Sequence, residues 1–425
     1  MNVGSLFQFQ ENEILVSILS FWKIAIFIDL VVFWRIEMKN ILVLPLFTME
    51  SGHHRTADVL ISSFKKQDSY INCEKVDFLT YMNPVLEKSI SNLYLKWISN
   101  WPVNYSRFYK RFFSKKSDIL HSLYEALFLE KMEQLLEEKL PDLVICTHSF
   151  PSFLVNKLKE YGVCSTPMIN VYTDFFVNDL WGISQVDMHF VPSKEIKAEL
   201  IKASVPEENI IITGIITSDL ASKRKCRSTN KRKIRILVSG GSLGLGNQLF
   251  FLKQSVNKDL IEYRVLCGLN AKLYREISSL NLNLIKPLPY ITCPEQMNHL
   301  YNWADALITK PGGVTISEAI KKRIPIFIYS VLPGQEEINM NYLEKKGLVR
   351  KLNKARTVEE QVVTALKNPV ALIKMNKANE LFLSEIEMNS CLEVANYILE
   401  KVTSKNSNKR IQYLDQILSR IYCSL

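Results

Sequence analysis

The sequence lacks several motifs that would assign it to a familiar class of site. It has eight cysteines but no CxxC pair, which argues against a zinc or redox motif. No GK[ST] tripeptide follows a glycine-rich turn, so a Walker P-loop is excluded. No DxD sequence lies in a plausible metal-binding loop. We therefore expect no metal cofactor, and we expect most cysteines to be buried, reduced thiols of a cytosolic protein.

Positive charge exceeds negative charge, with 53 Lys and Arg against 43 Asp and Glu and a net charge of +10. A basic balance suits nucleic acid, an anionic membrane surface or an acidic substrate. Because the chain has no long Arg-rich arm and no nucleic-acid motif, we favour an anionic membrane and an anionic donor, with no nucleic-acid partner. Its 425 residues predict two or three domains.

Residues 1–38 form an apolar N-terminal extension, most hydrophobic at 13–34. Lys23 and Asp29 interrupt this run, and charges are costly inside a bilayer. The run has no small-residue cleavage site, which argues against a cleaved signal peptide. Three interpretations stay open: a poor membrane helix, an interfacial anchor, or an upstream translation artefact, since Met38 directly precedes the first clear strand. We favour the last two over a true span.

From Asn40 onward, short apolar runs alternate with helical patterns such as 54–66 and 119–139, which predicts an α/β protein with parallel sheets. The basic, polar stretch 221–233 separates two such series and is typical of an exposed linker. The expected strands are 41–47, 143–147, 168–172 and 189–192 in the first series, and 234–239, 263–267, 283–286, 306–309, 324–329 and 348–350 in the second.

We therefore predict two Rossmann-like domains, at 39–220 and 234–370, facing each other across a cleft. C-terminal helices and a tail follow at 371–425. Ligands bind at the carboxyl ends of the strands in such sheets, so the cleft is the expected site.

The stretch 310–342 has the most informative pattern: a glycine turn opens a helix, a buried strand follows, and a second turn opens another helix. The glycines let backbone N–H groups approach a ligand, and the helix start adds free N–H groups and a positive dipole end, which suits a diphosphate. A carboxylate in the first helix can accept hydrogen bonds from sugar hydroxyls. The residues assigned to a nucleotide-sugar donor are Lys310, Gly312, Gly313, Thr315, Glu318, Gln335, Glu336 and Asn339.

The glycine-rich turn of Gly240, Gly241 and Ser242 follows the strand 234–239 and also suits a phosphate. Such a loop is weak evidence by itself. Asn270 follows the next strand in a CGLN sequence that is compatible with a simple strand-to-helix turn.

The KPGG-x-T-x-x-EA and PGQE-x-x-N sequences at this spacing resemble the donor domain of a known family. They are similar to GT-B glycosyltransferases of the processive diacylglycerol glucosyltransferase and monogalactosyldiacylglycerol synthase group, of the glycosyltransferase family 28 type. The undecaprenyl-linked GlcNAc transferase of peptidoglycan synthesis is a more distant relative. The resemblance implies a GT-B fold, a UDP-glucose or UDP-galactose donor, a lipid acceptor and no required metal. It also places Asn270 near the uracil pocket, and it leaves residues 1–37 uncovered.

The turn after the first strand resembles the family's Gly-His turn through Gly52, His53 and Ala57. Residues 49–51 depart from the pattern, because relatives often carry more glycines there. A histidine at the cleft end of a strand can deprotonate an acceptor hydroxyl, because its unperturbed pKa is about 6.5. His53 is therefore one candidate for the catalytic base.

Asp174 follows another apolar strand in a segment that resembles the family's TD…W…D…VPS pattern. Its carboxylate can orient His53 or accept the proton itself, so the base stays open between these two residues. Gly52, His148 and Trp181 are expected on the acceptor side, with a core or capping role as the alternative for His148.

Aromatic rings alternate with Lys and Arg in the segment 94–116. Such a segment can enter a bilayer interface and contact lipid phosphates, bind single-stranded nucleic acid, or be a helix with buried rings and solvated charges. Relatives carry an aromatic-rich segment here and act at membranes, which favours lipid.

The resemblance implies an inverting transferase that moves a hexose from UDP-hexose to a diacylglycerol-like acceptor, at the cytoplasmic face of a membrane. Three alternatives stay open: a UDP-sugar transferase with a non-lipid acceptor, a UDP-sugar 2-epimerase, and a nucleotide-sugar-binding protein without activity.

Overall fold

The computed structural model describes residues 40–46, 51–85, 87, 89, 93, 118–219, 233–242, 244 and 261–401. The predictions for the extension 1–38, most of the linker 221–233, the segment 94–116 and the tail beyond 401 therefore lie outside the described residues. Residues 40–396 form one compact unit. A second unit comprises 1–39 and 397–425, of which only the helical residues 397–401 are described.

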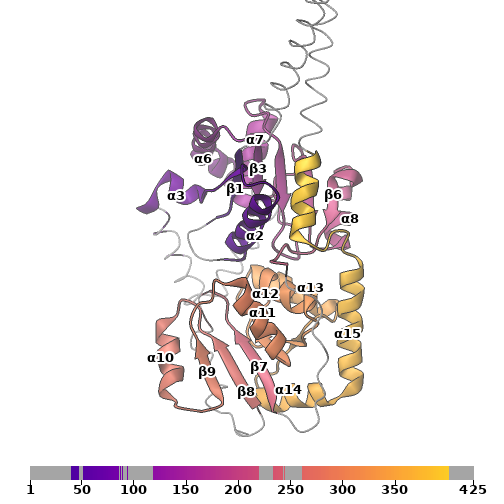
Figure 1. Ribbon diagram of the computed structural model, residues 1–425. Coiled ribbons are helices and arrows are strands. Elements are labelled where there is room, and N and C mark those ends of the chain that lie inside the picture. The colour runs from indigo at the N-terminus through magenta and orange to yellow at the C-terminus, as the bar shows by residue number, and fades with distance from the viewer. Residues whose placement is uncertain are drawn as a thin grey trace, which may run out of the picture. The chain divides into compact units, whose positions relative to one another are not determined.

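The first domain is built on a parallel sheet with the strand order β2-β1-β3-β4-β5-β6 (Figure 1). Every residue of β3, β4, β5 and β6 is buried, as in a parallel sheet covered on both faces. The strands are β1 (Asn40–Leu44), β2 (Asn72–Lys75), β3 (Leu143–Cys146), β4 (Met168–Val171), β5 (Met188–Val191) and β6 (Ile210–Ile212). The helices are α2 (Gly52–Gln67), α3 (Phe78–Met82), α6 (Asp118–Lys139), α7 (Ser149–Glu160), α8 (Lys194–Lys202) and the 3-10 turn η1 (Glu207–Asn209).

The second domain repeats this architecture with the strand order β12-β11-β10-β7-β8-β9, again all parallel. The strands are β7 (Ile234–Ser239), β8 (Ile261–Leu266), β9 (Ile285–Leu288), β10 (Ala306–Thr309), β11 (Ile326–Ile328) and β12 (Arg350–Lys351). The helices are α10 (Ala271–Ser279), α11 (Pro294–Trp303), α12 (Gly313–Lys321), α13 (Gln335–Lys345), α14 (Val358–Lys367) and α15 (Pro369–Ser384).

Alternate residues of the central strands supply two separate cores in the second domain. Leu237 and Leu307 pack in one core, whereas Ile236 and Ile308 pack in the other. Successive side chains of a strand point to opposite faces, so both faces of this sheet are covered. Phe175 belongs to the first of these cores although it lies in the first domain. A segment of the first domain is thus packed into the second.

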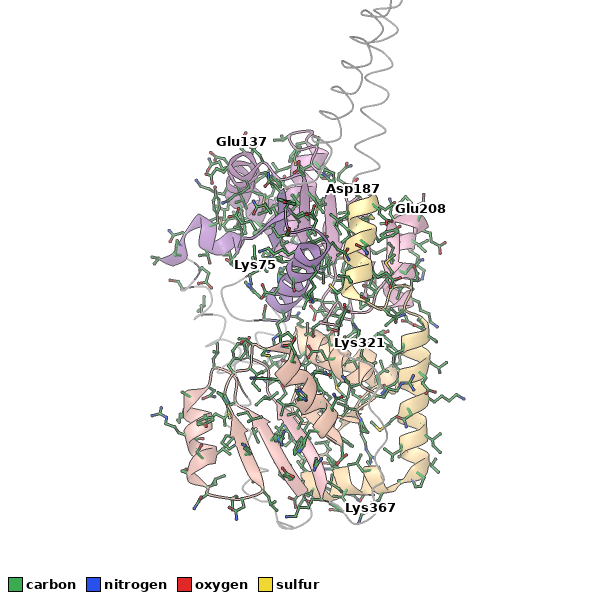
Figure 2. All side chains as sticks on the ribbon, in the orientation of Figure 1. Lys75, Glu137, Asp187, Glu208, Lys321 and Lys367 are labelled. Carbon is green, nitrogen blue, oxygen red and sulfur yellow. The ribbon has the colours of Figure 1, made fainter. Side chains whose placement is uncertain are left out.

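The chain returns to the first domain after α15. Glu385 pairs with Lys194 of α8 at 2.7 Å, and Glu387 pairs with Lys197 of the same helix at 3.1 Å. Further along the boundary between the domains, Lys321 at the end of α12 donates a hydrogen bond of 3.0 Å to Thr217 Oγ1 (Figure 2). The two sheets and the returning C-terminal segment confirm the predicted GT-B arrangement.

The predicted strands are all present, with ends that shift by a few residues. Two further strands were not predicted. The strand β2 has the polar sequence NCEK at a sheet edge, and β6 is only 3 residues long. The strand β2 gives no apolar run, and the run of three isoleucines in β6 is short. The described cysteines are free thiols, and three of them, Cys146, Cys267 and Cys391, are buried. Among the described residues, no helix is both long enough and apolar enough to cross a membrane.

Candidate functional site

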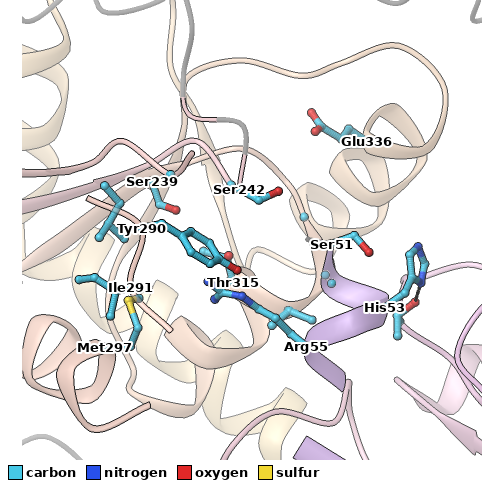
Figure 3. Close-up of a pocket in the computed structure, with 18 of the residues that line it drawn as sticks. Ser51, His53, Arg55, Ser239, Ser242, Tyr290, Ile291, Met297, Thr315 and Glu336 are labelled. Atoms are coloured by element: carbon cyan, nitrogen blue, oxygen red, sulfur yellow. Dashed lines mark hydrogen bonds between the residues drawn. The ribbon is translucent and has the colours of Figure 1, made fainter. Parts of the chain in front are cut away.

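A cavity of about 250 Å³ lies where the carboxyl ends of both sheets meet (Figure 3). The first domain contributes residues that follow β1 and β4, and the second contributes residues that follow β7 to β11. Of the predicted site residues, those that line the cavity are Gly52, His53, Asp174, Gly241, Ser242, Gly312, Gly313, Thr315, Gln335, Glu336 and Asn339. The predicted residues outside the lining are Gly240, Asn270, Lys310, Glu318, His148 and Trp181.

The N-terminus of α12 forms one wall of the cavity through Gly312, Gly313 and Thr315. The first glycine is the N-cap, and a Cβ built on it would meet nothing within 4 Å. A Cβ built on Gly313 would lie 2.1 Å from the backbone oxygen of Thr173. The first glycine therefore leaves room for a ligand at the free N–H groups of the helix. The second allows the first domain to approach the helix.

The turns after β7 and β8 interlock beside this wall. Gly241 has a φ of +74° and Gly268 a φ of +59°, a backbone region that favours glycine. A Cβ on Gly268 would lie 2.2 Å from the oxygen of Ser242. Asn270 caps α10, because its Oδ1 accepts a hydrogen bond of 2.9 Å from the N–H of Leu273. The side chain of Asn270 therefore serves the helix start, which was the alternative to its predicted role near uracil.

The hydrogen bonds of His53 determine which of its ring nitrogens can act as a base. Nδ1 lies 2.9 Å from the backbone oxygen of Thr147 and 2.6 Å from Oγ1 of Thr173. A carbonyl oxygen only accepts, so Nδ1 must carry the proton in the neutral ring. Nε2 then keeps its lone pair, and His53 lines the cavity. This is the tautomer that a general base needs.

Burial lowers the pKa of His53 below its ordinary value, while the charge of Asp174 and the hydrogen bond to Thr147 oppose that shift. The ring is therefore neutral at pH 7.

We expect the acid limb of the activity profile below pH 6.5, with activity lost as pH falls through the pKa of His53. Folding favours the neutral ring, so stability from this residue is also complete above about pH 6.5 and falls below it. Rates and melting temperatures measured from pH 4 to 8 check this, and an acid limb above pH 7 would contradict it.

His148 packs against the candidate base without lining the cavity. The two imidazole centroids are 4.6 Å apart at an interplanar angle of 73°. Nδ1 of His148 accepts the N–H of Phe150 at 3.1 Å, which caps α7. Burial lowers the pKa of His148 well below its ordinary value, and the neighbouring histidines add to this effect. His148 is thus a neutral cap that supports the ring of His53, which matches the alternative considered for it.

Trp181 lies in the core of the first domain instead of on the acceptor side. It is 8% exposed, and its ring centroid lies 4.4 Å from that of Tyr172. The burial of a large apolar ring in this core is sufficient reason for a tryptophan here.

Asp174 joins the two domains. Its Oδ1 accepts a hydrogen bond of 2.9 Å from Nδ2 of Asn339, and its Oδ2 accepts one from Nε2 of Gln335. Both amides belong to α13. Two of the residues assigned to the nucleotide-sugar donor are therefore in contact with the second candidate for the base.

Glu318 is buried in α12 beside the cavity, where Tyr301 donates a hydrogen bond of 2.7 Å to its Oε2. Burial raises the pKa of Glu318, and this hydrogen bond and the charge of Arg55 oppose that rise. The guanidinium of Arg55 lies over the ring of Tyr290, 5.7 Å from the centroid, and both residues line the cavity (Figure 3). The carboxylate predicted to accept hydrogen bonds from sugar hydroxyls is thus bonded to Tyr301 and lies outside the cavity lining.

Glu336 lies at the opening of α13 in the cavity wall (Figure 3). Its Oε2 accepts a hydrogen bond of 2.6 Å from the N–H of Leu332. Burial raises the pKa of Glu336, and the positive charge of Lys310 opposes that rise. Lys310 therefore acts on the site through its charge. Within the described residues, no group of three or more His, Cys, Asp or Glu side chains is arranged to hold a metal ion.

Several residues of the cavity were missed by the sequence reasoning. Arg55 lies on α2, two positions after the candidate base. No pattern in the sequence predicts that its side chain lines a cavity with residues of the second domain. The loop after β9 contributes Pro289, Tyr290 and Ile291, and α11 contributes Met297 and Tyr301. The only sequence feature that could have indicated this loop is the aromatic residue beside a proline, Pro289-Tyr290.

Two family models cover most of the chain. Residues 53–216 match monogalactosyldiacylglycerol (MGDG) synthase, and residues 235–389 match the glycosyltransferase family 28 C-terminal domain. An uncharacterized glycosyltransferase of Bacillus subtilis (strain 168), YkoN, is 38% identical over 370 residues, 86% of this chain and 98% of the relative. A processive diacylglycerol beta-glucosyltransferase of Bacillus cereus (strain G9842) is 30% identical over 352 residues, 79% of this chain and 88% of the relative.

Solved structures with the same fold are more distant in sequence. Acinetobacter baumannii MurG gives a TM-score of 0.53 at 14% identity, covering 85% of this chain and 99% of that one. A putative UDP-N-acetylglucosamine 2-epimerase from Listeria monocytogenes also gives 0.53 at 14%, covering 88% and 97%. These likenesses concern the fold alone, whereas the sequence relatives are transferases. The chain therefore belongs to the GT-B glycosyltransferases of the family 28 type that include the monogalactosyldiacylglycerol synthases and the processive diacylglycerol glucosyltransferases.

Proposed function

We propose that the protein transfers a hexose from UDP-glucose or UDP-galactose to the hydroxyl of a diacylglycerol-like lipid, with inversion at the anomeric carbon. One observation carries the proposal: His53, whose Nδ1 is held by the backbone oxygen of Thr147, lines the same cavity as the N-terminus of α12. One group takes a proton from an acceptor hydroxyl, and the other stabilises an anionic leaving group.

In the proposed reaction, Nε2 of His53 removes the proton of the acceptor hydroxyl as its oxygen attacks the anomeric carbon. The bond from that carbon to the diphosphate oxygen breaks on the opposite face, and UDP leaves. The α-linked donor thus gives a β-linked product. The free N–H groups at Gly312, Gly313 and Thr315 and the helix dipole stabilise the diphosphate, so a divalent metal is not needed.

We propose that the nucleoside end of the donor binds beside Arg55 and Tyr290. We expect Arg55→Ala to weaken the binding of UDP about tenfold, because the guanidinium covers Tyr290 and faces Glu318. Arg55→Lys keeps the charge but loses the planar face, and should recover only part of the affinity. The matched control is Arg275→Ala on the exposed side of α10. Titration of UDP by calorimetry checks this, and equal affinities for Arg55→Ala and the control would contradict it.

The lipid acceptor and a peripheral position at the cytoplasmic face of an anionic membrane are supported by the names of the relatives and by the net charge of +10. In α6, which begins just after the aromatic and basic segment, Leu123 and Leu127 are 55% and 59% exposed one turn apart.

Flotation with anionic and neutral liposomes, combined with NMR of the product anomer, tests this proposal. Binding to anionic vesicles and a β linkage are expected. An α linkage would refute inversion, and activity on soluble acceptors without vesicle binding would refute the lipid acceptor.

A further inference from the structure

The strand end at residues 173–175 is inserted between the helices of the second domain. The N–H of Phe175 donates a hydrogen bond of 2.9 Å to Oδ1 of Asn339. The ring of Phe175 stacks on that of Tyr342 of α13, with centroids 5.3 Å apart and an interplanar angle of 8°. Phe175 is 2% exposed and Asn339 is 1% exposed. This segment is therefore held against α13 by the buried contacts of Phe175, the residue that follows Asp174.

Asp174 has both carboxylate oxygens engaged by this helix. Oδ1 accepts from Asn339 and Oδ2 accepts from Gln335. An ionised carboxylate only accepts hydrogen bonds, so each amide must present its NH₂ group to it. Both oxygens of Asp174 thus accept a hydrogen bond from α13 and hold that helix to the first domain.

The orientation of the two amides follows from the same chemistry. Oδ1 of Asn339 accepts from a backbone N–H, which can only donate, so this amide cannot rotate without losing two hydrogen bonds. Within the described residues, no such second hydrogen bond fixes the oxygen of Gln335. Its Nε2 is turned to Asp174, and Gln335 lines the cavity. Gln335 therefore leaves Oε1 as an acceptor for a ligand, beside the second N–H of Nε2.

We propose that Asp174 is a positioning residue that turns the Gln335 amide so that its oxygen faces the donor sugar. The site then selects a sugar that presents a hydroxyl as hydrogen-bond donor at that point. This inference rests on the proposed function of the cavity, and it separates the roles of the two candidate bases. His53 handles the proton, and Asp174 sets the hydrogen-bonding face that the sugar meets.

The variant Asp174→Asn changes the hydrogen-bonding pattern while keeping the shape of the side chain. The new amide at position 174 can still accept from Asn339 through its oxygen, but its NH₂ group then faces Gln335. Gln335 must rotate, which places Nε2 instead of Oε1 toward the ligand. We expect the KM for the donor to rise about tenfold with a much smaller change in kcat. Asp179→Asn, an exposed residue in the same loop, is the matched control and should leave both constants unchanged.

The double variant Asp174→Asn/Gln335→Glu exchanges the two groups and supplies a rescue. The new NH₂ group at position 174 donates to the new carboxylate at position 335, which again offers an oxygen to the ligand. We expect this variant to recover most of the donor affinity that Asp174→Asn loses. If Asp174 were the base, neither variant would have one at position 174. Both would then lose about 10²–10⁴-fold in kcat, and that result would overturn the proposal.

Donors in which one sugar hydroxyl is replaced by fluorine, at positions 3, 4 and 6 in turn, test the orientation of Gln335 directly, because fluorine cannot donate. The wild type should bind one of these analogues at least tenfold more weakly than the parent. Asp174→Asn should lose that preference, and the double variant should regain it. An identical preference in all three proteins would overturn the proposal.

The free energy of unfolding in urea, measured without ligand, tests the contact between positions 174 and 335 independently of what the cavity binds. The pair 174 and 335 should be coupled in a double-mutant cycle, so that the double variant is more stable than the sum of the single changes predicts. Additive effects would overturn the proposed contact. Coupling in a protein that turns over no UDP-hexose would instead count against the proposed function.

Discussion

Replacing His53 by asparagine should reduce kcat by about 10²–10⁴-fold while the affinity for UDP stays close to that of the wild type. Nδ1 of the ring serves only to hold it, through Thr147 and Thr173, and an asparagine amide can replace part of that contact. Nothing in the new side chain can accept a proton at neutral pH. The prediction is therefore a loss confined to the chemical step, which single-turnover rates and UDP titrations measure separately.

The control for this variant is His299→Asn, which changes an exposed histidine outside the cavity lining. It should leave rate, affinity and melting temperature unchanged. A His53 variant that keeps full kcat would remove this residue from the chemistry, and a loss of UDP affinity equal to the loss of rate would indicate a phosphate contact.

The second large effect is expected from Gly313→Ala. The added Cβ would lie 2.1 Å from the oxygen of Thr173 and 2.6 Å from Cδ1 of Ile215, and the first of these atoms belongs to the backbone. The strand end at 173–175 would have to move away from α12. We expect the free energy of unfolding to fall by about 1–3 kcal/mol. Activity should fall by about 10²-fold, because Thr173 can no longer hold the ring of His53.

Gly312→Ala provides the matched comparison, since it adds the same methyl group one residue earlier. Its φ is −82° and a Cβ there meets nothing within 4 Å, so stability should not change. UDP should bind more weakly, because the methyl group occupies the approach to the helix N-terminus. Urea unfolding and UDP calorimetry on both variants check the contrast. Equal stabilities of Gly313→Ala and Gly312→Ala would show that the close approach of Thr173 to α12 does not require a glycine at position 313.

The sequence predicts most of the fold because buried parallel strands are short, continuous apolar runs. Strands such as Leu143–Cys146 and Ala306–Thr309 are buried at every position, and glycine turns follow β7, β8 and β10, which carry part of the site. The strand Asn72–Lys75 was not predicted, because it lies at a sheet edge and its polar sequence gives no apolar run. Pairing with β1 along the ladder, a long-range effect, makes it a strand.

The candidate site is predicted well for backbone features and less well for side chains. Gly312 and Gly313 lie in the cavity wall as expected, because a strand–turn–helix pattern determines where a helix N-terminus lies. The contact of Asp174 with α13 spans 161 residues in the chain, so no local pattern encodes it. Trp181 resembled an acceptor-side residue, but packing against Tyr172 decides its place.

The central claim is that this cavity transfers a hexose from UDP to a lipid, and UDP release tests it most directly. Purified protein is supplied with UDP-glucose, UDP-galactose or UDP-GlcNAc, with and without diacylglycerol in mixed micelles that contain anionic lipid. We predict that UDP release depends on diacylglycerol, occurs with one of the two hexose donors, and falls by about 10²–10⁴-fold in His53→Asn. Confirmed binding of UDP without release from any donor in the presence of diacylglycerol would contradict the proposed lipid glycosyltransferase activity.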